Sequence, residues 1–359
     1  MRFNLLKKIL SVPNYLSLPV AGIEISNSSI KYVEFVNNNG VLSLKKASEV
    51  MLEPNIVKNG DIINKTTLIE ALVEVKNNIT SDFVKVSIPE EKSYIFDVVL
   101  PKEAKNNVRE ALEFKIEENV PLKLDEVYFE YEIVEDEINS KNIVLSVSVI
   151  SKKVISDYVE LFDKAGLFPR SFEIESKMIA NSVIFRGDQK NTIIVNIKDD
   201  TTELVAVING FVRLSSSVFI GENTIRETLL RTGLFKDKIS VDSFFENDFS
   251  FETTDMKDAY GSLANIFSVL KDEVDKFDGY VTKNFSKKIE RIILCGKSSA
   301  MPSFGKHINQ NINSEVKLAD VWINTFDIKE SVVRLKFNDS LGFAAPIGLF
   351  VSSIKKTNA

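Results

Sequence analysis

The sequence predicts an α/β protein made of two copies of one domain, with a smaller α+β module inserted into the first copy. Three observations support this prediction. A strand, polar turn and strand cover residues 20–36, the same pattern returns at residues 192–208, and the pattern changes between residues 83 and 151. Internal similarity at so long an offset indicates a duplicated domain rather than a short-period repeat.

The first hairpin consists of two alternating apolar strands, residues 20–25 and 30–36, joined by a polar turn. Backbone N–H groups in such a turn can form a concave anion site, and hydroxyl groups add donors. Hairpins that only build a sheet have the same pattern, so phosphate binding and a structural role both stay open. The residues that would bind phosphate are Ser26, Asn27, Ser28, Ser29 and Lys31.

The second hairpin repeats this layout, and each copy continues through a glycine turn into a third strand, at residues 41–44 and 211–218. Alignment of the two copies pairs Glu24 with Asn196, Ser26 with Lys198, and Ser29 with Thr201. The phosphate-turn candidates of the second copy are Lys198, Asp199, Asp200, Thr201 and Thr202.

Composition describes an ordinary globular chain of 359 residues, with 44% apolar and 27% charged residues, long enough for two or three domains. The net charge of -6 argues against a general nucleic-acid binder. The single cysteine, Cys295, excludes an internal disulfide, and the single histidine, His307, excludes a histidine-cluster metal site. We nominate no catalytic residue.

No segment is expected to cross a membrane, because the longest uncharged runs are 15 residues and contain proline, against the roughly 20 apolar residues that a spanning helix needs. Pro13 and Pro19 also argue against a signal peptide, so we expect a cytoplasmic setting. Residues 1–12 form a short amphipathic pattern, which indicates either a docking helix for a membrane surface or partner, or an ordinary terminal helix.

Further elements follow from apolar spacing and caps. We expect helices at 66–79, 102–119, 151–165, 222–231, 257–285 and 340–353, and strands at 84–88, 94–100, 126–134, 143–151 and 289–294. The chain then divides into an N-terminal segment 1–19, a first domain 20–82, the inserted module 83–151, the rest of the first domain 152–190, a second domain 191–334, and a return to the first domain 335–359.

Together these features resemble the actin, Hsp70 and sugar-kinase superfamily, which implies duplicated actin-like domains with a ribonuclease H-like core. The stretch Gly22 to Glu34 is similar to the opening of the PilM family of actin-like type IV pilus assembly proteins. Further stretches follow the order of that family: Ser87–Pro89, Val99–Pro101, Ala111–Glu117, Val120–Glu126, Val159–Leu167, Leu318–Asp320 and Gly342–Leu349.

The resemblance implies a cytoplasmic scaffold, peripheral to the inner membrane, in a type IV pilus or a related type II secretion or competence machine. Its implied partners are the cytoplasmic tail of a PilN-like membrane protein, docked between the first domain and the inserted module, other platform proteins, and a second copy of the chain. Phe3-Asn4-Leu5-Leu6 is similar to the docking motif of PilN tails, so the N-terminus is a candidate occupant of its own groove or of that of a neighbouring copy.

The superfamily also implies ATP and Mg²⁺. Glu24 and Asn196 stand at the metal positions, and Gly221, Gly296, Lys297 and Ser298 stand on the adenosine side. Both phosphate turns depart from the usual aspartate-any-glycine, reading Glu24-Ile25-Ser26 and Asn196-Ile197-Lys198, which puts binding in doubt. Lys198 either supplies the charge that a weakened metal site lacks, or it merely fills an empty cleft or pairs with Asp199 or Asp200.

Two other functions remain as alternatives. One is a working actin-fold ATPase or kinase, and the other is an FtsA-like cell-division adaptor, for which the tail after Ile354 is short.

Overall fold

The first sheet has five strands in the order β10-β6-β1-β2-β3 in the computed structural model, which describes residues 20–38, 41–135, 141–237, 240–241, 244, 257–310, 312–326 and 333–357. Strands β10, β6 and β1 run parallel, whereas β2 and β3 run antiparallel to their neighbours. The strands are β1 (Ala21–Ile25), β2 (Ser29–Asn38), β3 (Val41–Met51), β6 (Phe83–Ile88) and β10 (Phe168–Ile174).

The second sheet repeats this topology in the order β13-β12-β11-β14-β15. Its strands are β11 (Thr192–Ile197), β12 (Thr202–Ile208), β13 (Phe211–Val218), β14 (Arg291–Cys295) and β15 (Glu315–Leu318). The register confirms the predicted alignment of the two hairpins. Glu24 pairs with Lys31 in the first, and Asn196 pairs with Glu203 in the second.

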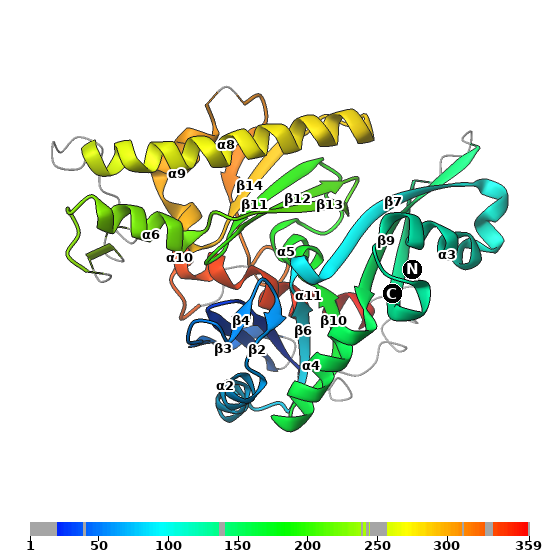
Figure 1. The fold of residues 1–359 in the computed structure, drawn as a ribbon, viewed down its shortest axis with the longest axis horizontal. Helices are drawn as coiled ribbons and strands as arrows, with labels where there is room; N and C mark the ends of the chain where they lie inside the picture. The colour runs from blue at the N-terminus through cyan, green and yellow to red at the C-terminus, as the bar shows by residue number, and fades with distance from the viewer. Residues whose placement is uncertain are drawn as a thin grey trace.

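Two helices, α5 (Glu175–Val183) and α11 (Ala344–Thr357), lie between the sheets and pack against both (Figure 1). The outer face of the first sheet is covered by α2 (Lys65–Asn78) and α4 (Lys152–Lys164). The outer face of the second sheet is covered by α6 (Glu222–Arg231), α8 (Lys257–Phe285) and α9 (Pro302–Ile308). Buried apolar side chains on both faces of each sheet make each domain a three-layer unit.

The inserted module is a three-stranded antiparallel sheet, β7-β9-β8, with α3 (Val108–Asn119) packed on it. Its strands are β7 (Ser93–Pro101), β8 (Val127–Glu135) and β9 (Asn142–Ser151). The single helix expected at 102–119 is in fact two, because a 3₁₀ turn at Lys102–Asn106 precedes α3 and Asn107 between them leaves helical geometry. Strand β6, which the expected module range includes, pairs with β1 and β10 and so belongs to the first sheet.

Short elements complete the described chain: β4 (Val57–Lys58), β5 (Asp61–Ile62), the 3₁₀ turns Glu90–Lys92, Leu124–Glu126, Lys297–Ala300 and Leu341–Phe343, and α10 (Phe337–Ser340). The expected helix at 340–353 is therefore preceded by separate short turns, and its main part is α11. Within the described ranges no helix is both long and apolar enough to span a bilayer. The amphipathic pattern at 1–12 and its Phe3–Leu6 motif lie outside the described residues.

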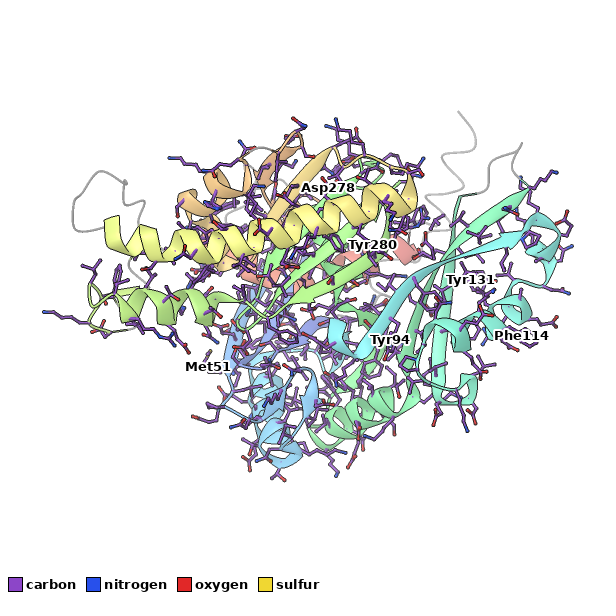
Figure 2. All side chains as sticks on the ribbon, turned by 45° about the horizontal axis from the view of Figure 1, so that its top comes forward. Met51, Tyr94, Phe114, Tyr131, Asp278 and Tyr280 are labelled. Carbon is purple, nitrogen blue, oxygen red and sulfur yellow. The ribbon has the colours of Figure 1, made fainter. Side chains whose placement is uncertain are left out.

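The module contacts the second domain as well as the first. Arg213 of β13 donates from Nε to both carboxylate oxygens of Asp97 on β7, at 2.8 and 2.7 Å. The Ser146 hydroxyl donates to the carbonyl oxygen of Val212 at 2.9 Å. The module exposes Tyr94, Phe114 and Tyr131, and the last two lie toward the end of the view opposite Met51 (Figure 2).

Candidate functional site

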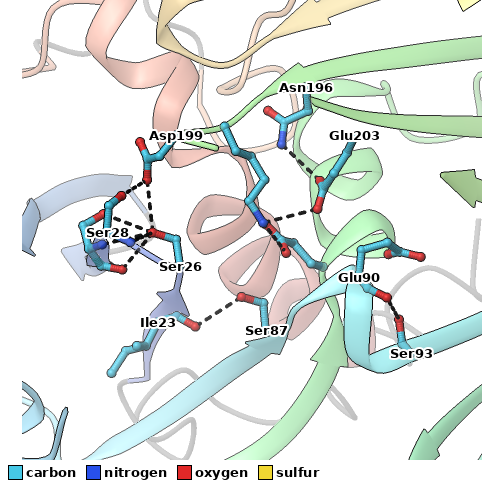
Figure 3. Close-up of polar contacts among 12 residues, drawn as sticks. Ile23, Ser26, Ser28, Ser87, Glu90, Ser93, Asn196, Asp199 and Glu203 are labelled. Carbon is cyan, nitrogen blue, oxygen red and sulfur yellow. Dashed lines mark hydrogen bonds and ion pairs between the residues drawn. The ribbon is translucent and has the colours of Figure 1, made fainter. Parts of the chain in front are cut away.

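The two hairpin turns face each other across the interdomain cleft and are hydrogen-bonded directly (Figure 3). The hydroxyl groups of Ser26 and Ser28 both donate to the Asp199 carboxylate, the former at 3.1 Å. Beside them, Asn27 Nδ2 donates to Asp200 Oδ2 at 3.1 Å. A carboxylate of the second domain thus accepts the hydroxyl donors that the first turn offers.

The first turn also satisfies its own backbone donors. The Ser26 N–H donates to the Ser29 carbonyl at 2.9 Å, and Ser26 Oγ accepts from the N–H groups of Ser28 at 3.3 Å and Ser29 at 3.1 Å. In the second copy the Lys198 N–H donates to the Thr201 carbonyl at 2.8 Å, which is the equivalent hairpin bond. The N–H groups that a phosphate would need are therefore directed inward in the first turn.

Lys198 lies at the centre of a buried acidic cluster. Its ammonium nitrogen is 2.7 and 2.8 Å from the two carboxylate oxygens of Glu175 and 3.3 Å from Glu203 Oε1. The side chain of Lys198 is 12% exposed, and those of Glu175 and Glu203 are 1% and 0% exposed. Asn196 Nδ2 donates to Glu203 Oε2 at 3.2 Å and fixes that carboxylate.

These partners differ from the pairing expected for Lys198, since Glu175 and Glu203, and neither Asp199 nor Asp200, pair with its ammonium group. Sequence reasoning missed Glu175 and Glu203. Glu203 carried a signal, because it stands at the position of Lys31 in the duplicated hairpin. Glu175 carried none, because it reads only as the first residue of a helix.

Burial and the neighbouring charges together set the protonation of this cluster. Burial, followed by the neighbouring Glu175 carboxylate, raises the pKa of Glu24 to about 8, although Lys31 and Lys198 act in the opposite direction. Burial and Glu175 also raise the pKa of Glu203. Burial would lower the pKa of Lys198, but Glu175 and Glu203 raise it well above its ordinary value, so the ammonium stays charged. Burial opposes ionisation of Asp199, yet Lys31 and the serine hydroxyls hold its pKa below the ordinary value.

The raised pKa of Glu24 predicts that stability falls as pH rises. The folded protein holds the Glu24 proton up to a pKa of about 8, whereas the unfolded chain releases it at 4.5. Below pH 4.5 the contribution of the Glu24 proton to stability is complete, and between these two values the free energy of unfolding drops, by on the order of 4 kcal/mol.

Denaturant unfolding of Glu24→Gln across this pH window is expected to show a flatter profile and higher stability at pH 8. The exposed Glu53→Gln serves as control, and a Glu24→Gln profile parallel to that of the unsubstituted chain contradicts the assignment.

Close backbone contacts require both glycines that were predicted on the adenosine side, Gly221 and Gly296. A Cβ on Gly296, whose φ is +87°, would lie 2.0 Å from the carbonyl oxygen of Ile197, and one on Gly221 would lie 2.5 Å from that of Asp199. Both glycines are therefore required where the backbone passes close to β11 and its turn. Lys297 pairs with Asp339 at 3.2 Å, and the Ser298 hydroxyl donates to Glu222.

A cavity of about 940 Å³ in the cleft brings most of the predicted residues together, and carboxylates outnumber cations along its wall. The carboxylates are Glu24, Glu49, Asp199, Asp200, Glu222, Glu227 and Asp339, and the cations are Lys31, Lys198, Arg226 and Lys297. Ser28, Ser29, Asn196 and Gly296 also line it, whereas Ser26, Asn27 and Thr201 face a small pocket on the other side of the two turns. Thr202 is buried, and its hydroxyl donates a hydrogen bond to the Ile220 carbonyl oxygen. Among the described residues, no group of acidic, histidine or cysteine side chains is arranged to hold a metal ion.

A second cavity, of about 710 Å³, lies between the first domain and the module, and Val207 and Gly210–Val212 of the second domain also line it; we call it the module groove. Its walls include Tyr128–Glu132 of β8 and Ser171–Ile174 of β10. Its floor includes Lys177, Met178, Ala180 and Asn181 of α5. Among the described strands β8 pairs only with β9 and β10 only with β6, so two sheet edges border the groove.

Comparison with known proteins agrees with this architecture. The structure is similar to one titled PilM-PilN type IV pilus biogenesis complex, with a TM-score of 0.72 and 14% identity over 94% of this chain and 99% of that one. Weaker similarity extends to the ethanolamine utilization protein EutJ from Carboxydothermus hydrogenoformans (TM-score 0.53, 12% identity, 96% and 93% covered) and to ADP-bound MreB5 of Spiroplasma citri (0.53, 11%, 95% and 98%). No protein with a curated description matches the chain.

Similarity to these structures confirms the predicted actin-like fold. A family model described as type IV pilus assembly protein PilM matches residues 22–225, a span that holds both hairpins and the whole module. The chain therefore belongs to the PilM family of actin-like type IV pilus assembly proteins.

Proposed function

We propose that this chain is a cytoplasmic scaffold of the type IV pilus inner-membrane platform, or of a related type II secretion or competence machine, that docks the cytoplasmic tail of a PilN-like membrane protein in the module groove. The observation that supports the proposal is the groove itself, because the sequence resemblance implies a partner docked between the first domain and the module. A similar structure is titled as a PilM-PilN complex.

The shape of the module groove suits an extended peptide. Strands β8 and β10 are both sheet edges, so a peptide strand could hydrogen-bond to the backbone of either one. Apolar side chains of the floor and walls, including Met178, Ile150 and Phe172, would receive alternate side chains of that peptide.

Polar groups in the same groove lack partners. Within the described part of the chain, the buried hydroxyls of Ser148 and Ser171 make no hydrogen bond, and both residues line the groove. Buried hydroxyls without partners are costly, and a side-chain rotation toward the groove would let a peptide backbone satisfy them. Lys177 on the floor of the groove is already paired, with Glu132 of the β8 wall at 2.9 Å, and so ties the floor to that wall.

A tail peptide from a PilN-like protein is expected to bind the intact chain saturably, as measured by fluorescence anisotropy. The variant Ala180→Arg, which places a large charged side chain on the groove floor, is expected to weaken binding at least about tenfold by steric exclusion.

Val159→Arg is the matched control, because Val159 is 46% exposed on α4 and lines neither cavity. It should bind the peptide as the unsubstituted chain does. Thermal unfolding of both variants checks that each is folded. Absence of saturable binding at high micromolar peptide, or equal binding by Ala180→Arg, would count against docking in this groove.

A docked membrane-protein tail would hold the chain at the inner membrane. Docking of the tail is therefore consistent with the proposed location at the membrane periphery. Contacts with other platform proteins and with a second copy of the chain would strengthen this attachment. Pull-down with a membrane-anchored tail, compared with an untethered tail, tests that part separately.

A further inference from the structure

We propose that Lys198 and Asp199 take the places that a metal ion and a phosphate group would take in a nucleotide-binding relative, so that the chain's own charges hold the two domains together without ATP. The two side chains follow one another in the second hairpin turn, and both reach across the cleft to the first domain. We call this arrangement the internal ion lock.

The cation half of the internal ion lock is the Lys198 ammonium group. Carboxylate oxygens are the ligands that Mg²⁺ prefers, and Glu175 and Glu203 supply them here. Their oxygens instead surround the ammonium nitrogen at 2.7, 2.8 and 3.3 Å. Because all three side chains are nearly excluded from water, the cation cannot leave without stranding two buried carboxylates. The donor set therefore does not fit an added metal ion while Lys198 is present.

The anion half is the Asp199 carboxylate. It accepts hydrogen bonds from the hydroxyls of Ser26 and Ser28, the groups expected to grip a phosphate. The Lys31 ammonium acts on the same carboxylate electrostatically. A phosphate would have to displace Asp199 to reach these donors, so the turn does not fit a nucleotide phosphate in this arrangement.

The charge along the wall of the cleft cavity also does not fit the nucleotide that the superfamily implies. Besides the protonated Glu24, its wall holds six carboxylates against four cationic groups, so a multiply charged anion would enter a field of its own sign. Arg226 and Lys297 are already paired, with Glu222 and Asp339 respectively. The charge along the cleft wall therefore opposes the binding of a nucleotide phosphate.

Both halves of the lock join the two domains. Glu175 begins α5 of the first domain, and Lys198 and Glu203 belong to the second. Helix α5 also provides the floor of the module groove, so the lock would fix that floor whether or not nucleotide is present.

The first test uses the unsubstituted full chain, with thermal unfolding and titration calorimetry in the presence and absence of millimolar ATP and Mg²⁺. The expected result is an unchanged Tm and no heat of binding. A ligand that binds only the folded state would stabilise it by about 2.7 kcal/mol at one hundred times its Kd. A reproducible rise in Tm that requires both ATP and Mg²⁺ overturns the proposal, and it leaves tail docking untouched.

The second test compares two lysines that each lie between two carboxylates. Lys198→Met is expected to lower Tm by about 5 °C, because it strands Glu175 and Glu203 in the interior. Lys65→Met is the matched control, since Lys65 lies 2.8 Å from both Asp157 and Glu160 but is 42% exposed, and it should change Tm by less than about 1 °C. Equal effects of the two substitutions would overturn the lock.

A double variant guards against misfolding of Lys198→Met. Adding Glu203→Gln removes one of the stranded carboxylates and is expected to recover part of the lost Tm or of the lost soluble yield. No recovery would overturn the assignment of the ion pair, because a purely steric role for the lysine stem would not depend on the charge at residue 203.

Discussion

Replacing Gly348 with alanine is expected to lower the free energy of unfolding by at least about 3 kcal/mol, more than an ordinary overpacked core substitution costs. The new Cβ would lie 1.8 Å from the carbonyl oxygen of Met178 and 2.5 Å from its carbonyl carbon. These are backbone atoms of α5, so neither can rotate away. Helices α11 and α5 would have to separate, and with them the layer between the two sheets. Urea unfolding followed by circular dichroism measures the loss.

Gly279→Ala is the matched control for this substitution. Gly279 also lies inside a helix, α8, but it is exposed and a Cβ there would meet nothing within 4 Å. Alanine should raise stability at that position by about 0.5–1 kcal/mol, because it restricts the unfolded chain more than glycine does. If Gly348→Ala and Gly279→Ala change stability by the same amount, the close contact between α11 and α5 is wrong.

Arg213→Met is expected to cost about 3 kcal/mol and to loosen the module from the second domain. Arg213 is 3% exposed and Asp97 is 17% exposed, so removal of the guanidinium leaves a mostly buried carboxylate without its main partner. The Arg213 guanidinium also lies over the ring of Phe285, 5.0 Å from its centroid. Hydrogen exchange should therefore speed up in β7 and β13 together, and urea unfolding gives the change in stability.

The control for this prediction is Lys177→Met, which breaks another ion pair between the module and the rest of the chain. Lys177 and Glu132 are 20% and 50% exposed, so water can hydrate the remaining carboxylate and the cost should stay below about 1 kcal/mol. Adding Asp97→Asn to Arg213→Met should restore part of the loss. If it does not, the charge of Asp97 is not what Arg213 compensates.

Local signals in the sequence predicted most of the secondary structure. Ser151 caps α4 by accepting a hydrogen bond from the N–H of Lys153, and Gly166, with φ of +70°, ends it, as expected. The helix expected at 102–119 failed because apolar spacing continues across Asn107 although the backbone breaks there. Spacing reports which face is buried, and it does not report whether each turn of the helix closes.

Pairing between distant segments was harder to predict from the sequence. Strand β6 alternates like the strands of the module, and only its hydrogen bonds to β1 and β10 assign it to the first sheet. Gly221 and Gly296 stand where a nucleotide would require glycine, yet the backbone of β11 and its turn already requires it there. A motif predicts that glycine stands at a position, but the reason why glycine is needed depends on which backbone atoms approach that position in the folded chain.

The sequence by itself determined the duplicated hairpins, their register and the family, because strand alternation, turn residues and ordered motifs are local properties. Only the tertiary structure decided how the charges of the cleft are satisfied. The ionisation and the energy of a buried charge depend on the opposite charges nearest to it in space and on the exclusion of water. Lys198 therefore meets Glu175 rather than Asp199 or Asp200, its neighbours in the chain, and Asp199 meets two serines of the other domain.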